Sequence, residues 1–149
     1  MLRQVLLFTH LAGVIIWVGG MFFAYFCLRP AAAATLEPPK RLPLWTAAFA
    51  RFLPISAVAV VLVLVSGLIM MLQVGMAFAP LGWHVMFALG LLMSGVFVYV
   101  YARLFPRLRR HSDGANWPEA AKALNSIRHL VAVNLVLSVC TVAAVAFAR

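Results

Sequence analysis

The stretch Phe52–Val74, FLPISAVAVVLVLVSGLIMMLQV, decides the fold class of this chain. It contains no charged side chain, and its length matches the roughly 20 apolar residues that one helix needs to cross a bilayer core about 30 Å thick. Three more apolar runs lie at about 4–28, 82–104 and 128–148. We therefore predict an all-α protein, a four-helix transmembrane bundle that forms a single integral membrane domain over residues 1–149.

Composition supports a membrane protein and limits its partners. The chain is 66% hydrophobic, with a mean hydropathy of +1.05, whereas soluble domains average about 45–50% apolar residues. Its net charge of +9 could suit nucleic acid. However, the basic residues flank apolar runs and form no aromatic–basic stripe, so we expect membrane lipids as partners and no nucleic acid. The acidic residues lie outside the predicted spans, which excludes a carboxylate proton relay.

The connections between the apolar runs differ in charge. Ten of the twelve Lys and Arg residues lie in the segments 29–51 and 103–128, while the segment 75–81 has none. Cytoplasmic loops are enriched in Lys and Arg, so we place both long connections in the cytoplasm and both termini on the outer side of a bacterial-type inner (plasma) membrane. Four prolines should prevent a continuous helix over 29–51. Trp117 should begin a short helix in the third connection.

Three histidines lie inside or at the ends of the apolar runs, where an unpartnered imidazole is costly: His10, His84 and His129. A metal ion or haem iron is a common partner of neutral imidazole. At 100° per residue, His10 shares a helix face with Gly13 and Trp17, which could line a cofactor pocket. His129 should lie roughly 15–20 Å from His10 along the membrane normal, whereas His84 lies near the same side as His10. We therefore predict His10 and His84 as ligands of one metal, with His129 as a separate metal candidate.

Each histidine also has a structural interpretation. His10 could hydrogen-bond a carbonyl or hydroxyl group of the next helix, His84 could anchor at the membrane interface, and His129 could extend toward lipid headgroups. Thioether sulfur is soft enough to bind Cu(I). Because no methionine cluster lies beside a histidine on one helix face, we expect the methionines to pack in the core.

Short motifs resemble two related families of small membrane proteins. His10 followed by Trp17–Phe22, WVGGMF, resembles the opening helix of the copper-resistance D (CopD) family. Gly82–Met86, GWHVM, and Arg128 before the last span are similar to the HemJ-type protoporphyrinogen oxidases. The CopD resemblance implies copper uptake or tolerance, and the HemJ resemblance implies a b-type haem. The HemJ pattern has a lysine where this chain has Met86, and its Asn-Glu-x-Pro is absent after Arg128, which argues against protoporphyrinogen oxidation.

Taken together, these features predict a b-type haem-binding membrane redox protein, similar to a cytochrome b. As an oxidoreductase it would transfer electrons or oxidise a quinol, a porphyrin or a reactive oxygen species. His10 and His84 would ligate haem b, Trp17 and Gly13 would line the pocket, and Arg128 would bind a carboxylate. Unused small-residue faces suggest a homodimer. Two alternatives stay open: a CopD-type protein whose metal is copper, and a cofactor-free structural subunit.

Overall fold

The computed structural model describes residues 1–147, which are helical almost throughout. The elements in chain order are α1 (Leu2–Phe23), the π-helical η1 (Ala24–Leu28), α2 (Arg29–Thr35), α3 (Pro38–Val74), the 3-10 turn η2 (Met76–Phe78), α4 (Leu81–Tyr99), the π-helical η3 (Val100–Leu104), α5 (Phe105–Asp113) and α6 (Trp117–Phe147). Contiguous elements join into four rods that are long and apolar enough to cross a membrane: Leu2–Thr35, Pro38–Val74, Leu81–Asp113 and Trp117–Phe147. The predicted all-α fold with four spans is confirmed.

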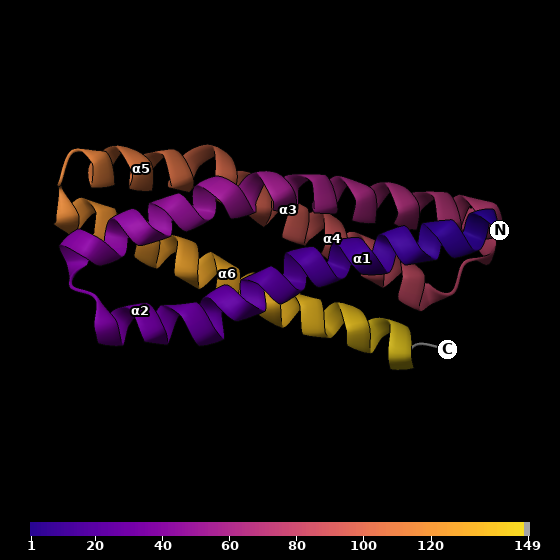
Figure 1. The fold of residues 1–149 in the computed structure, drawn as a ribbon. Coiled ribbons are helices and arrows are strands. Elements are labelled where there is room, and N and C mark those ends of the chain that lie inside the picture. The colour runs from indigo at the N-terminus through magenta and orange to yellow at the C-terminus, as the bar shows by residue number, and fades with distance from the viewer. Residues whose placement is uncertain (148–149) are drawn as a thin grey trace.

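The rods lie side by side, as Figure 1 shows. The start of α1, the end of α6 and the α3–α4 connection lie at one end of the bundle. The α2–α3 and α5–α6 connections lie at the opposite end, which we call the basic end because most Lys and Arg residues belong to the segments that meet there. The two charged connections therefore share one end, as the sequence predicts. Which side of a membrane this end faces stays a prediction.

Two π-helical segments allow the first and third rods to continue through a proline. A proline inside an α-helix lacks the N–H donor, and its ring clashes with the carbonyl group four residues earlier. η1 ends two residues before Pro30, and η3 ends two residues before Pro106. The wider π turn shifts the hydrogen-bond register just before each ring, which accommodates the missing donor.

The break between the first two rods is much shorter than the sequence suggests. Only Leu36 and Glu37 separate α2 from α3. α3 begins at Pro38, where a proline is tolerated because the first turn has no intrahelical acceptor for its N–H. It also contains Pro43 and Pro54. The helix is therefore not continuous over 29–51, as predicted, but the interruption is confined to Leu36 and Glu37.

The third connection is also mostly helical. α5 extends the third rod to Asp113, and a tight turn that includes Ala115, with a φ of 53°, reverses the chain. The Asn116 side-chain oxygen accepts a hydrogen bond from the Glu119 N–H at 3.5 Å, which caps the start of α6. The short helix predicted at Trp117 is instead the first part of the 31-residue α6.

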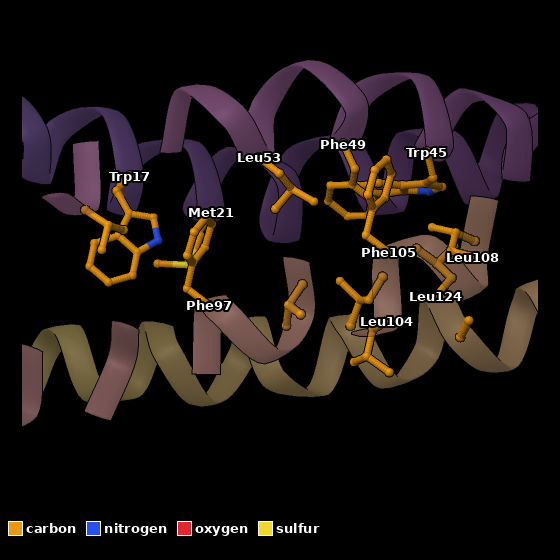
Figure 2. Packing of buried hydrophobic residues seen from close by; sticks show 14 of the residues in the cluster. Trp17, Met21, Trp45, Phe49, Leu53, Phe97, Leu104, Phe105, Leu108 and Leu124 are labelled. Carbon is orange, nitrogen blue, oxygen red and sulfur yellow. The ribbon is translucent and has the colours of Figure 1, made fainter. Parts of the chain in front are cut away.

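Aromatic rings and close helix contacts hold the rods together (Figure 2). Trp17 of α1 meets Phe97 of α4 edge to face, with 6.0 Å between ring centroids. Gly13 lets α1 approach α3 closely, since a Cβ at this position would lie 2.7 Å from Val63 Cγ2. This close contact between α1 and α3 brings His10, one turn before Gly13, against the backbone of α3.

Candidate functional site

His10 is held by α3. Its Nδ1 lies 3.0 Å from the Val63 carbonyl oxygen and 3.1 Å from Ser66 Oγ. Gly67 leaves room for the imidazole ring, because a Cβ there would lie 3.2 Å from His10 Cε1. The structure thus contains the contacts with a neighbouring carbonyl and hydroxyl that the structural interpretation of His10 requires.

These contacts determine which nitrogen of His10 carries the proton. A carbonyl oxygen can only accept, so Nδ1 donates to Val63. The Ser66 hydroxyl donates to the Leu62 carbonyl within α3, which leaves its oxygen as a second acceptor for Nδ1. With the proton on Nδ1, Nε2 keeps its lone pair. Metal-ligating histidines show this arrangement, in which one ring nitrogen bonds a backbone carbonyl and the other binds the metal.

His84 and His129 are tied only to nearby backbone. His84 Nδ1 lies 3.3 Å from the carbonyl oxygen of Pro80, just before α4. His129 is exposed, and its Nδ1 lies 2.9 Å from the carbonyl oxygen of Asn125, one turn earlier in α6. Within residues 1–147 no group of three or more His, Cys, Asp or Glu side chains could hold a metal ion. The pairing of His10 with His84 stays a prediction, as does a role for His129.

The face of α3 that contacts His10 also carries a methionine one turn further along the helix. Gly67 contacts His10, and Met71 follows one turn later on the same helix face. Met71 is buried, with 1% of its surface exposed. Its burial agrees with the expectation that the methionines pack in the core. Its place on the face that contacts His10 does not follow from comparing methionines and histidines along single helices. The sequence contains one signal for this arrangement. Gly67 and Met71 are four residues apart, which places a small residue and a thioether on the same face of α3.

Trp17 lines a small cavity between the rods, together with Asn134 of α6. The volume of this cavity is about 30 Å³, which has room for about two water molecules but not for a porphyrin. Gly13, the other residue expected in a haem pocket, packs against Val63 instead. Trp17, Gly13 and their neighbours therefore do not enclose a haem-sized space as the rods are packed.

Arg128 lies near the basic end of α6. Its Nε is buried and has no hydrogen-bond partner among the described residues. Arg29 of α2 and Arg41 of α3 are its electrostatic neighbours. Sequence spacing does not reveal this grouping, because the three arginines belong to three different helices.

Comparison with known proteins identifies one family. A family model described as CopD, copper resistance protein D, matches residues 46–148. His84 and His129 lie inside the matched region, and His10 lies before it. Neither a curated protein nor a solved structure matches the chain. The match supports the CopD part of the resemblance and gives no support to the HemJ part or to a bound haem.

Proposed function

Because the chain belongs to the copper resistance protein D (CopD) family, we propose that it binds copper inside the membrane as cargo, for copper uptake or tolerance. It is a multi-pass membrane protein, with four apolar rods of spanning length. The observation that carries the proposal is the His10 imidazole. It is oriented by Val63 and Ser66 through Nδ1, which leaves the Nε2 lone pair free to bind a metal ion.

The donor set near His10 suits Cu(I). This ion prefers soft ligands such as thioether sulfur, and imidazole nitrogen also binds copper. His10 supplies the imidazole nitrogen, and Met71, on the α3 face that contacts His10, supplies the thioether sulfur. We infer that these two side chains form the core of the copper site.

The charge of the site fits a transported ion. His10 and Met71 are both neutral ligands when they bind metal. The bound Cu(I) therefore keeps its positive charge in an apolar bundle, where an uncompensated charge is costly. Because neutral ligands leave this cost uncompensated, the ion is released more readily than from a site with anionic ligands.

Copper binding by the purified protein tests the proposal. The detergent-solubilised protein is loaded with Cu(I) under anaerobic reducing conditions and desalted, and retained copper is measured by elemental analysis. We expect the wild type to retain copper, and His10→Gln and Met71→Leu to retain much less. His129→Gln is the matched control, because His129 is an exposed histidine bonded only within its own helix. Equal retention by His10→Gln and His129→Gln, with both proteins folded, would refute His10 as the ligand.

An optical spectrum separates the earlier alternatives from copper binding. A b-type haem protein shows a Soret band and a sharp reduced α-band after purification, a Cu(I) site shows neither, and a structural subunit binds neither group. We expect a colourless protein that takes up copper. A stoichiometric Soret band would instead support the haem hypothesis with His10 and His84 as ligands.

A further inference from the structure

Three arginines from three different rods gather at the basic end. Arg29 of α2 and Arg41 of α3 lie close enough to Arg128 of α6 to interact with it electrostatically. The ion pairs within residues 1–147 lie within α5 and within α6, and they involve none of these three residues. Like charges held together without a counter-ion repel one another. The cluster therefore has the charge of an anion site.

The cluster also contains a buried donor without an acceptor. Arg128 Nε is shielded from solvent and has no hydrogen-bond partner among the described residues. Arg29 is held beside it by stacking, with its Cζ 5.1 Å from the centroid of the Tyr25 ring. A buried, charged N–H group that lacks a protein acceptor is stabilised when a ligand supplies one.

Two arginines of the cluster, Arg29 and Arg128, also border an apolar hollow between η1, α3 and α6. Arg29, Arg128 and Tyr25 line it toward the basic end, and Met21 and Phe52 line it deeper in the bundle. Met21 precedes Arg29 by about 12 Å along the first rod, at 1.5 Å per residue. The hollow has a volume of about 20 Å³, so a hydrocarbon chain would lie along its apolar surface rather than be enclosed by it. The hollow thus has arginines at one end and apolar side chains along the rest of its lining. This combination matches a ligand with an anionic group and a hydrocarbon tail.

We propose that this site binds an anionic phospholipid. Its phosphate accepts hydrogen bonds from Arg128 and Arg29 and is further stabilised by Arg41, and one acyl chain lies along Met21 and Phe52. Guanidinium groups bind phosphate with paired, charge-assisted hydrogen bonds. The rods have the length and composition of membrane spans, so a phospholipid can reach the hollow from the side. The proposal does not depend on copper binding, because His10 lies 19 residues before Arg29 in the first rod, roughly 28 Å away along the helix axis.

Lipid binding is tested with the full-length protein in detergent at physiological ionic strength. Phosphatidylglycerol, phosphatidylcholine and inorganic phosphate are added in separate experiments, and the unfolding midpoint is measured. We expect phosphatidylglycerol to raise the midpoint with increasing concentration, because a ligand of the folded state stabilises it. Phosphatidylcholine and inorganic phosphate should have little effect. An equal shift with phosphatidylcholine would overturn the charge argument, and an equal shift with inorganic phosphate would overturn the lipid assignment.

Matched variants locate the site. We expect the double variant Arg29→Gln/Arg128→Gln to lose at least half of the phosphatidylglycerol shift. The control Arg107→Gln/Arg110→Gln removes two exposed arginines of α5 near the same end and should keep the shift. Native mass spectrometry of the wild type gives a second measurement that needs no variant, with preferential retention of phosphatidylglycerol over phosphatidylcholine expected. Equal losses in the two double variants, or retention without preference, would overturn the proposal.

Discussion

Trp17 Nε1 and Asn134 Oδ1 belong to side chains that line one cavity, and neither atom has a hydrogen-bond partner within residues 1–147. The indole N–H is a donor and the amide oxygen is an acceptor. An unpaired buried donor costs about 1–3 kcal/mol. The adjoining space of about 30 Å³ has the volume of a small hydrated cavity.

Trp17→Phe should be tolerated much better than Trp17→Ala. The phenylalanine removes the unpaired donor and retains a ring that can pack against Phe97, so we expect a loss of less than about 1.5 kcal/mol. Trp17→Ala also loses the core packing and should cost about 3–5 kcal/mol. Thermal unfolding in detergent measures both variants. A similar loss in both would mean that the indole N–H makes a strong bond.

Gly13→Val should weaken the contact between α1 and α3. A side chain at Gly13 would collide with Val63 and lie 3.0 Å from the backbone oxygen of Ala59, and such overpacking costs about 1–3 kcal/mol. Gly19→Val is the control, because no atom lies within 4 Å of a Cβ at Gly19. The unfolding midpoints should fall for Gly13→Val and change little for Gly19→Val. Equal midpoints would contradict the close packing of α1 on α3.

Ser66→Ala should lower the copper affinity of the His10 site. It removes one of the two acceptors that orient the imidazole ring, while the Val63 carbonyl remains. Groups that orient a metal ligand typically contribute about 10–100-fold to affinity, so with one acceptor left we expect roughly tenfold weaker binding. Competition with a chromogenic Cu(I) chelator measures the change. Ser126→Ala, whose hydroxyl bonds the Lys122 carbonyl within α6, should leave the affinity unchanged; a tenfold loss there would show that the effect is not local.

The orientation of the bundle can be tested by cysteine labelling. We expect the basic end to face the cytoplasm because of the excess of Lys and Arg there. In a variant without Cys27 and Cys140, Ala115→Cys at the basic end should react with a membrane-impermeant maleimide only after permeabilisation. Ala77→Cys in the α3–α4 connection should react in intact cells. The reverse labelling pattern would invert the predicted topology.

The candidate site shows what can be inferred along one helix and what cannot. His10 stands out in the sequence because it is a polar group in an apolar run, and its need for a partner follows from desolvation alone. Its partners Val63 and Ser66 belong to another helix, and so does Met71. No periodicity within α1 indicates them, because they depend on how α1 and α3 are rotated and offset against each other.

By itself, the sequence determined four spans and the shared end of the two charged connections, because both follow from the length of apolar runs and from the placement of charge. Only the tertiary structure decided that most of the expected loops are helical and that Arg29 and Arg41 lie near enough to Arg128 to act on its charge. The physical reason is that spans of nearly uniform apolarity leave the rotation and register of each helix unspecified. Local packing then sets them, as where Gly13 lets α1 approach α3 and where η1 and η3 accommodate a proline.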